Sequence, residues 1–116
     1  ALDKGWKNGT QGFDAVVVKP ARRDWRTVAA THPESPLVLT SAMDHALGQM
    51  FAAYEAAVAL SEGQSLDFCG LCTEHLFEKD EFFERVSSNG GFLEADRSGG
   101  GLGFGEVLEG LPWRRL

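Results

Sequence analysis

The fold is decided by the stretch DAVVVKP, residues 14–20, in which four apolar residues run directly into a lysine and a proline. A continuous apolar run of this length is typical of a strand buried on both faces, as in parallel sheets. Proline cannot donate a backbone hydrogen bond to a neighbouring strand, so we expect the strand to end there. The question is why Lys19 follows a buried strand.

Strands and helices are predicted to alternate from this stretch onward. We expect strands at 13–18, 37–40 and 66–71, helices at 22–31, 43–61 and 73–88, and in the tail, 91–116, loops with one or two short strands. The glycines of NGG, residues 89–91, are typical of a helix end, and Ser41 with Asp44 has the spacing of a capping box. This order of elements predicts an α/β fold built of parallel β/α units.

The ends of the predicted strands carry the residues that are candidates for chemistry. In parallel β/α sheets, functional groups gather at the carboxyl ends of the strands. Lys19, Thr40–Ser41 and Cys69–Leu71 each follow a predicted strand, so we expect them along one edge of the sheet.

Composition narrows the class of protein. The chain of 116 residues is 43% hydrophobic and 24% charged, which suits one small globular domain. Its net charge of −6 argues against nucleic-acid binding, and no apolar run approaches the roughly 18 residues of a membrane span. The N-terminal residues lack a signal-peptide pattern, so a cytoplasmic protein is expected. Because the sequence starts at Ala1 without methionine, we expect it to be part of a longer protein.

Lys19 and the CxxC motif, Cys69 to Cys72, each have two interpretations. Lys19 either extends its ammonium group to solvent or faces a pocket at the sheet edge, where it can act as an acid, a base or an electrostatic partner. The two cysteines are either small residues at a strand end, the interpretation we favour, or a thioredoxin-like redox pair. The glycine-rich stretch 98–106 lacks the GxGxxG spacing of a dinucleotide-binding loop, and no GK[ST] follows it as in a P-loop. We therefore interpret it as a flexible turn.

Several stretches, taken together in their order, resemble the last part of an enolase-superfamily barrel, and most of all the o-succinylbenzoate synthase family. AVVVKP resembles the sixth barrel strand with its Lys-Pro ending, and LVLTSAMDHALGQ (37–49) resembles the seventh strand and the turn and helix that follow. DFCGLCTEHLFEKD (67–80) resembles the eighth strand, and GGGLGFGEVLEGL (99–111) resembles the return toward the capping domain. ALDKGW (1–6) resembles the fifth strand, although Lys4 stands where the family usually has glutamate.

The resemblance implies strands five to eight of a TIM-like (β/α)7β barrel at 1–90 and a return segment toward the capping domain at 91–116. It implies a lyase that dehydrates 2-succinyl-6-hydroxy-2,4-cyclohexadiene-1-carboxylate to o-succinylbenzoate in menaquinone biosynthesis, with Mg²⁺ as cofactor. Lys19 would be catalytic, Asp3 would bind the metal, and the substrate would be bound by Thr40, Ser41, Gly70 and Leu71. The expected partners are a small carboxylate substrate and the missing N-terminal part of the enzyme, without which the chain is expected to be inactive.

Three alternatives remain open. The first is another superfamily member, of the muconate cycloisomerase or N-acylamino acid racemase type. The second is a thioredoxin-like oxidoreductase that uses Cys69 and Cys72, and the third is a non-catalytic β/α module kept for assembly.

Overall fold

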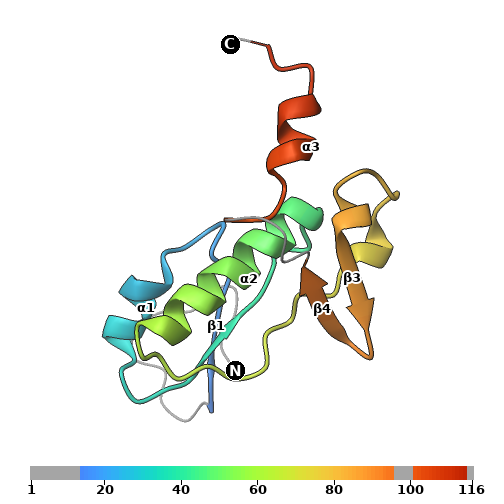
Figure 1. The fold of residues 1–116 in the computed structure, drawn as a ribbon. Coiled ribbons are helices and arrows are strands. Elements are labelled where there is room, and N and C mark those ends of the chain that lie inside the picture. The colour runs from blue at the N-terminus through green and yellow to red at the C-terminus, as the bar shows by residue number, and fades with distance from the viewer. Residues whose placement is uncertain (1–13, 96–100, 115–116) are drawn as a thin grey trace.

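The computed structural model describes residues 14–95 and 101–114. The chain is mixed α/β with two small sheets, and its elements follow one another as shown in Figure 1. They are β1 (Val16–Val18), α1 (Trp25–Thr31), β2 (Leu37–Leu39), α2 (Ala46–Ser61), two short 3₁₀ turns (Glu74–Leu76 and Phe83–Arg85), β3 (Val86–Asn89), β4 (Phe92–Ala95) and α3 (Gly105–Gly110).

The first sheet is parallel, as the sequence predicts. β1 and β2 pair in a register that places Val16 opposite Leu37 and Val18 opposite Leu39. The segment after α2 continues the sheet on the other side of β2, because Leu37 forms a parallel bridge with Leu66. The predicted third strand is therefore a parallel neighbour of β2, but it is reduced to one bridge and is not a continuous strand.

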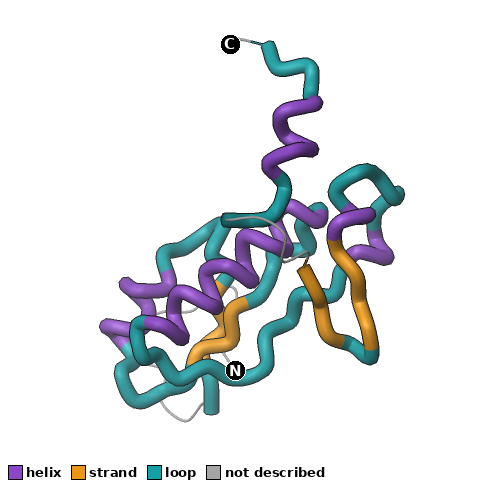
Figure 2. Tube along the Cα trace, viewed as in Figure 1, coloured by secondary structure: helices purple, strands orange, loops and turns teal. Residues whose placement is uncertain are grey.

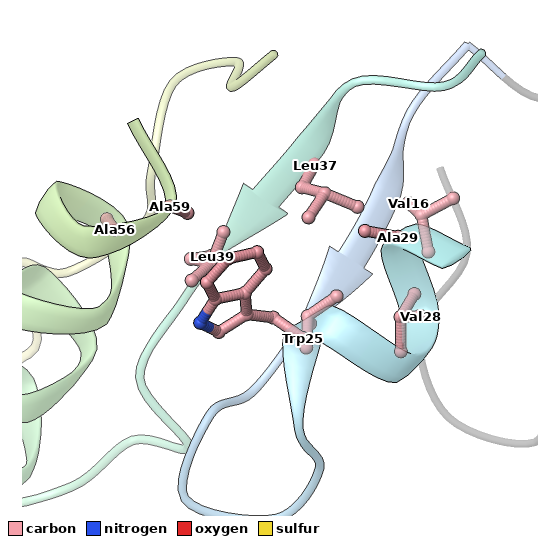
Figure 3. Close-up of a cluster of buried hydrophobic side chains, with 9 residues drawn as sticks. Val16, Trp25, Val28, Ala29, Leu37, Leu39, Ala56 and Ala59 are labelled. Carbon is pink, nitrogen blue, oxygen red and sulfur yellow. The ribbon is translucent and has the colours of Figure 1, made fainter. Parts of the chain in front are cut away.

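Both α1 and α2 cover the same face of this sheet. The side chains of β1 and β2 that point to this face pack with side chains from both helices, as Figure 3 shows; the buried cluster consists of Val16, Val18, Trp25, Val28, Ala29, Leu37, Leu39, Ala56 and Ala59. Val17 and Val38 alternate with these residues and are only half-buried on the opposite face. Successive β/α units that place their helices on one face form a singly wound sheet, the local arrangement that barrels also use.

Polar contacts reinforce the packing of α1 against α2. The indole N–H of Trp25 donates to the Glu55 carboxylate at 2.7 Å, and the Arg26 guanidinium lies over the Trp25 ring and also pairs with Glu62. Trp25 therefore satisfies its one polar group while its rings fill the core, which is what a buried tryptophan requires.

The predicted helix at 73–88 is wrong. The segment forms the two 3₁₀ turns and then β3, which pairs with β4 in an antiparallel hairpin, and Figure 2 shows that most of the chain between α2 and β3 is loop. The Asp80 carboxylate accepts hydrogen bonds from the backbone N–H groups of Phe82 and Phe83, and such local side-chain bonds compete with a continuous helix. Gly90 and Gly91 have φ values of 58° and 84°, so NGG forms a tight hairpin turn and does not end a helix.

A second core joins the hairpin and the tail to the start of α2. Ala46 and Met50 of α2 pack with Phe83 and Phe104, and Arg85 forms an ion pair with Glu106 at 2.7 Å.

β4 lies after residue 91 and pairs with β3, which lies before residue 90, so the hairpin crosses the predicted boundary at 90/91. The helix α3 was not predicted. None of the helices in the described part of the chain is long and apolar enough to span a membrane.

The helix α2 begins at Ala46 and not at residue 43, because Met43 has a φ of 60°, which does not occur in a right-handed helix. The predicted capping box does not form, because the Ser41 N–H donates to the Gly70 carbonyl and not to the Asp44 carboxylate. The Asp44 carboxylate accepts a hydrogen bond from the Ala42 N–H at 2.7 Å, whereas the residue at the N-cap is His45 and it makes no side-chain capping bond.

Gly48 allows the turn before α2 to fold back onto the helix, and alanine there should destabilise the protein. A Cβ at Gly48 would lie 2.4 Å from the Cβ of Asp44, so the turn must shift. We expect Gly48→Ala to cost about 1–3 kcal/mol of unfolding free energy, although alanine favours helices by about 1 kcal/mol. Gly105→Ala in α3, where a Cβ meets no atom within 4 Å, is the control and should be neutral or slightly stabilising in urea unfolding. Equal effects of the two variants would refute the proposed contact.

Candidate site at the carboxyl edge of the parallel sheet

The carboxyl ends of β1 and β2 meet as predicted, which brings Lys19 beside Thr40. Val18 pairs with Leu39, and the Thr40 N–H donates to the Val18 carbonyl at 2.9 Å, so the next residue of each strand lies at the same level. Lys19 is half-buried, and its carbonyl accepts hydrogen bonds from the N–H groups of Arg22 and Arg23, which form the turn into α1. Since side chains alternate along a strand and Val18 faces the helices, Lys19 belongs to the opposite face of the sheet, with Val17.

Thr40 and Ser41 are in contact with Gly70, at the edge of the sheet where all three were expected to lie. The Thr40 hydroxyl donates to the Gly70 carbonyl at 2.5 Å, and the Ser41 N–H reaches the same oxygen at 3.3 Å. A Cβ at Gly70 would lie 3.2 Å from the Thr40 hydroxyl oxygen, so glycine permits this close approach. The Thr40 hydroxyl proton is therefore engaged within the protein, and Thr40 is held as a link between two segments.

Leu71 lies in the turn that leads from Gly70 to Thr73. It is half-buried, and its carbonyl accepts a hydrogen bond from the Thr73 N–H at 3.1 Å. Of the predicted substrate-binding residues, the structure thus brings Thr40, Ser41 and Gly70 into direct contact and places Leu71 next in the chain.

A polar network beneath this edge was not predicted. Gln49 of α2 donates from its side-chain amide to the Asp44 carbonyl at 3.0 Å and accepts from the Thr73 N–H at 3.1 Å. The Ser41 and Thr73 hydroxyls lie 3.5 Å apart, and Ser41 and Gln49 are 4% and 1% exposed. The available signal was the position of Gln49, one turn after Ala46 on the buried face of a helix, where a polar residue is unusual.

The two cysteines do not have the properties of a redox pair. Both are free thiols; Cys69 packs against the sheet core, and the Cys72 thiol donates to the Gly91 carbonyl at 3.3 Å. Burial, together with the charge of Asp67, raises the pKa of the Cys69 thiol against the opposing effect of the Leu39 N–H, so the reactive thiolate is disfavoured. Cys72 is followed by a single 3₁₀ turn and not by an α-helix whose dipole would activate it.

The Mg²⁺ expected from the resemblance has no ligand set in the described part of the chain, since no group of three His, Cys, Asp or Glu residues is close enough together to hold a metal ion there. Asp3, the predicted metal ligand, lies outside the described residues.

His45 connects the start of α2 to the loop before β3. Its Nε2 lies 2.7 Å from the Asp80 carboxylate, and its ring makes edge contacts with three phenylalanines, Phe77, Phe82 and Phe83. Loss of hydration opposes ionisation of Asp80, but hydrogen bonds from His45 and from the Phe83 and Phe82 amides, with the charge of His45, hold the pKa of Asp80 below its ordinary value.

The lowered pKa of Asp80 predicts how the stability of this loop depends on pH. The ionised carboxylate stabilises the fold above the ordinary aspartate pKa of about 3.9, and this contribution is lost as the pH falls through the lower folded-state value. Asp80→Asn should therefore lower the urea midpoint at neutral pH, and the difference from the unaltered protein should shrink as the pH approaches about 3. Glu81→Gln, a neighbouring change outside this contact, is the control. A difference that stays constant with pH would contradict the assignment.

A comparison with curated proteins finds a partial match. The chain is 33% identical over 108 residues to a protein of Bdellovibrio bacteriovorus named o-succinylbenzoate synthase, and the match covers 90% of this chain. The chain spans about a third (32%) of the length of that curated relative. No protein-family model matches the sequence. The comparison therefore supports kinship with a fragment of an enolase-type lyase, and the parallel α/β arrangement is compatible with part of such a domain.

Proposed function

We propose that this chain forms part of an enzyme of the enolase superfamily, in which it supplies barrel strands five to eight. The singly wound sheet supports this proposal, because both helices cover one face and leave Val17 and Val38 on the other. In a barrel the helices likewise lie outside the sheet, and the opposite face of each strand points to the barrel interior. The segment at 65–70 would then be the last strand. The remaining strands and the capping domain would be supplied by residues outside this chain, on the same or a second polypeptide.

The particular enzyme that we propose is o-succinylbenzoate synthase. The observation that carries the proposal is the 33% identity to the Bdellovibrio protein of that name over nearly the whole chain. The reaction would be the dehydration of 2-succinyl-6-hydroxy-2,4-cyclohexadiene-1-carboxylate. A proton is removed from the carbon beside the carboxylate, the hydroxyl group departs as water, and the ring becomes aromatic.

In this proposal Lys19 stabilises the charge that develops on the substrate. Removal of a proton beside a carboxylate gives a dianionic intermediate, and a fixed ammonium group in a partly desolvated site lowers its energy. The half-buried position of Lys19 at the end of β1 suits that role. The proton itself would be moved by a base on a strand outside this chain.

Ser41, Gly70 and Leu71 would bind the succinyl part of the substrate. Thr40 would hold Gly70 in place by the hydrogen bond from its hydroxyl group to the Gly70 carbonyl. The contacts of Thr40 and Ser41 with Gly70 support this arrangement, since they bring the two strand ends to one location. The expected metal would need Asp3 together with ligands from outside this chain, so no step of this proposal depends on it.

The proposal is tested by assaying the complete enzyme, meaning this chain together with the strands that we place before it. We expect turnover of the cyclohexadiene carboxylate, followed by ultraviolet absorbance, and no comparable turnover of muconate or of N-acylamino acids. The 116-residue chain alone should be inactive. Turnover by the isolated chain would refute the half-barrel arrangement, and a complete enzyme active only on one of the other substrates would refute the assignment as a synthase.

A further inference from the structure

Gln49 is the most deeply buried polar side chain near the proposed site, and both ends of its amide are used. It is 1% exposed, its NH₂ group donates to the Asp44 carbonyl, and its oxygen accepts from the Thr73 N–H. A buried side chain amide is held rigidly when both of its ends are satisfied, because any rotation leaves a buried group unpaired.

The partners of Gln49 belong to the two segments that carry the proposed substrate contacts. Asp44 ends the turn that begins at Ser41, and its carboxylate also accepts the Ala42 N–H within that turn. Thr73 follows Gly70 and Leu71 by three and two residues, and its hydroxyl lies within 3.5 Å of both the Ser41 hydroxyl and the Asp44 carbonyl. Gln49 thus bridges the turn after β2 to the segment that follows Gly70.

Any buried glutamine needs partners for both ends of its amide, but the partners of Gln49 belong to two segments that are far apart in the sequence. The apolar neighbours of Gln49 on α2, Ala46 and Met50, pack into the second core, and an apolar side chain at 49 would continue that surface. The Thr73 N–H would then lose its partner on α2 and keep the bond that it makes to the Leu71 carbonyl two residues earlier.

We infer that Gln49 is a positioning residue of the proposed site, which fixes the separation between the Ser41 turn and the Gly70–Leu71 segment. This inference rests on the proposed function, in which those segments bind the succinyl group. Because Gln49 acts on binding segments and not on Lys19, its loss should weaken substrate binding and leave the chemical step nearly unchanged.

The test compares Gln49→Met, which has similar volume but no hydrogen-bonding amide, with Gln64→Met in the half-exposed turn after α2. Amide hydrogen exchange of the 116-residue chain is the first measurement. We expect exchange at Thr73 to accelerate about tenfold in Gln49→Met, with little change in β1 and β2 and no change in Gln64→Met. If Gln49→Met does not fold, Gln49→Glu is used. This variant keeps the oxygen that accepts from the Thr73 N–H, so the protection of Thr73 from exchange should be preserved, while the Asp44 carbonyl loses its hydrogen bond.

Steady-state kinetics of the complete enzyme is the second measurement. Gln49→Met should raise KM about tenfold with kcat within about threefold of the unaltered enzyme, and Gln64→Met should change neither. Unchanged exchange at Thr73, or accelerated exchange with unchanged KM, overturns the positioning role. If the unaltered enzyme does not turn over the cyclohexadiene carboxylate, the proposed function fails, and the bridge by Gln49 is then decided by the exchange rates alone.

Discussion

Lys19→Ala is expected to lower kcat of the complete enzyme by about 10²–10³-fold while leaving its folding nearly unchanged. Lys19 lies at the carboxyl end of β1, beside Thr40, where the proposed reaction develops negative charge. Removing one preorganised electrostatic group from a desolvated site commonly costs about 3–4 kcal/mol of transition-state stabilisation. The backbone of Lys19, whose carbonyl closes the turn to Arg22 and Arg23, is retained in the alanine variant, so the strand end should keep its shape.

The matched control is Lys79→Ala, because Lys79 is an exposed lysine in the loop before β3. It should leave kcat and KM unchanged. Circular dichroism and urea unfolding of both variants separate a chemical effect from a loss of structure. An active Lys19→Ala enzyme would mean that Lys19 is a surface lysine at a strand end, and the proposed role would have to be abandoned.

Leu39→Ala is expected to destabilise the chain by about 3 kcal/mol, whereas Val38→Ala should cost about 1 kcal/mol or less. Leu39 is fully buried between β2 and the two helices, and its truncation leaves a cavity that these elements cannot easily fill. Val38 is its neighbour on the opposite, half-buried face. Urea unfolding of the 116-residue chain measures both values.

The same pair of variants tests the half-barrel proposal when it is repeated in the complete enzyme. There Val38 would line the barrel interior and become fully buried, so the cost of Val38→Ala should rise to about 2 kcal/mol while the cost of Leu39→Ala stays the same. An unchanged cost for Val38→Ala would argue that this face remains open and that no further strands close over it.

The two β/α units were predictable because their signals are local and consistent. The valines before Lys19 and the LVL of β2 are continuous apolar runs, and each is followed by an amphipathic helix. The spacing of apolar residues within each segment and the order of the segments therefore both indicate β/α units. Parallel pairing and short connections then place Lys19 and Thr40 at one edge without further information.

The segment after Gly70 was not predictable in the same way. Leu76, Asp80 and Phe83 have a helical spacing. The phenylalanines of this segment nevertheless pack around His45 and Phe104, contacts that depend on residues far away in the sequence. The Asn-Gly pair at 89–90 was the local signal for a hairpin, and we interpreted it as a helix end. The role of Gln49 depends on Thr73, 24 residues away, and no pattern in a single sequence reports such a pair.

The register of the parallel sheet also has a consequence for how the chain acquires its structure. Val16 meets Leu37, and Leu37 meets Leu66, so each contact closes a loop of about 20 to 30 residues. Each parallel pair must close such a loop before its contacts can stabilise it, so assembly of the sheet should be the slow step of folding. Because the buried cluster on this sheet takes side chains from both α1 and α2, we expect the two β/α units to form together as one cooperative unit.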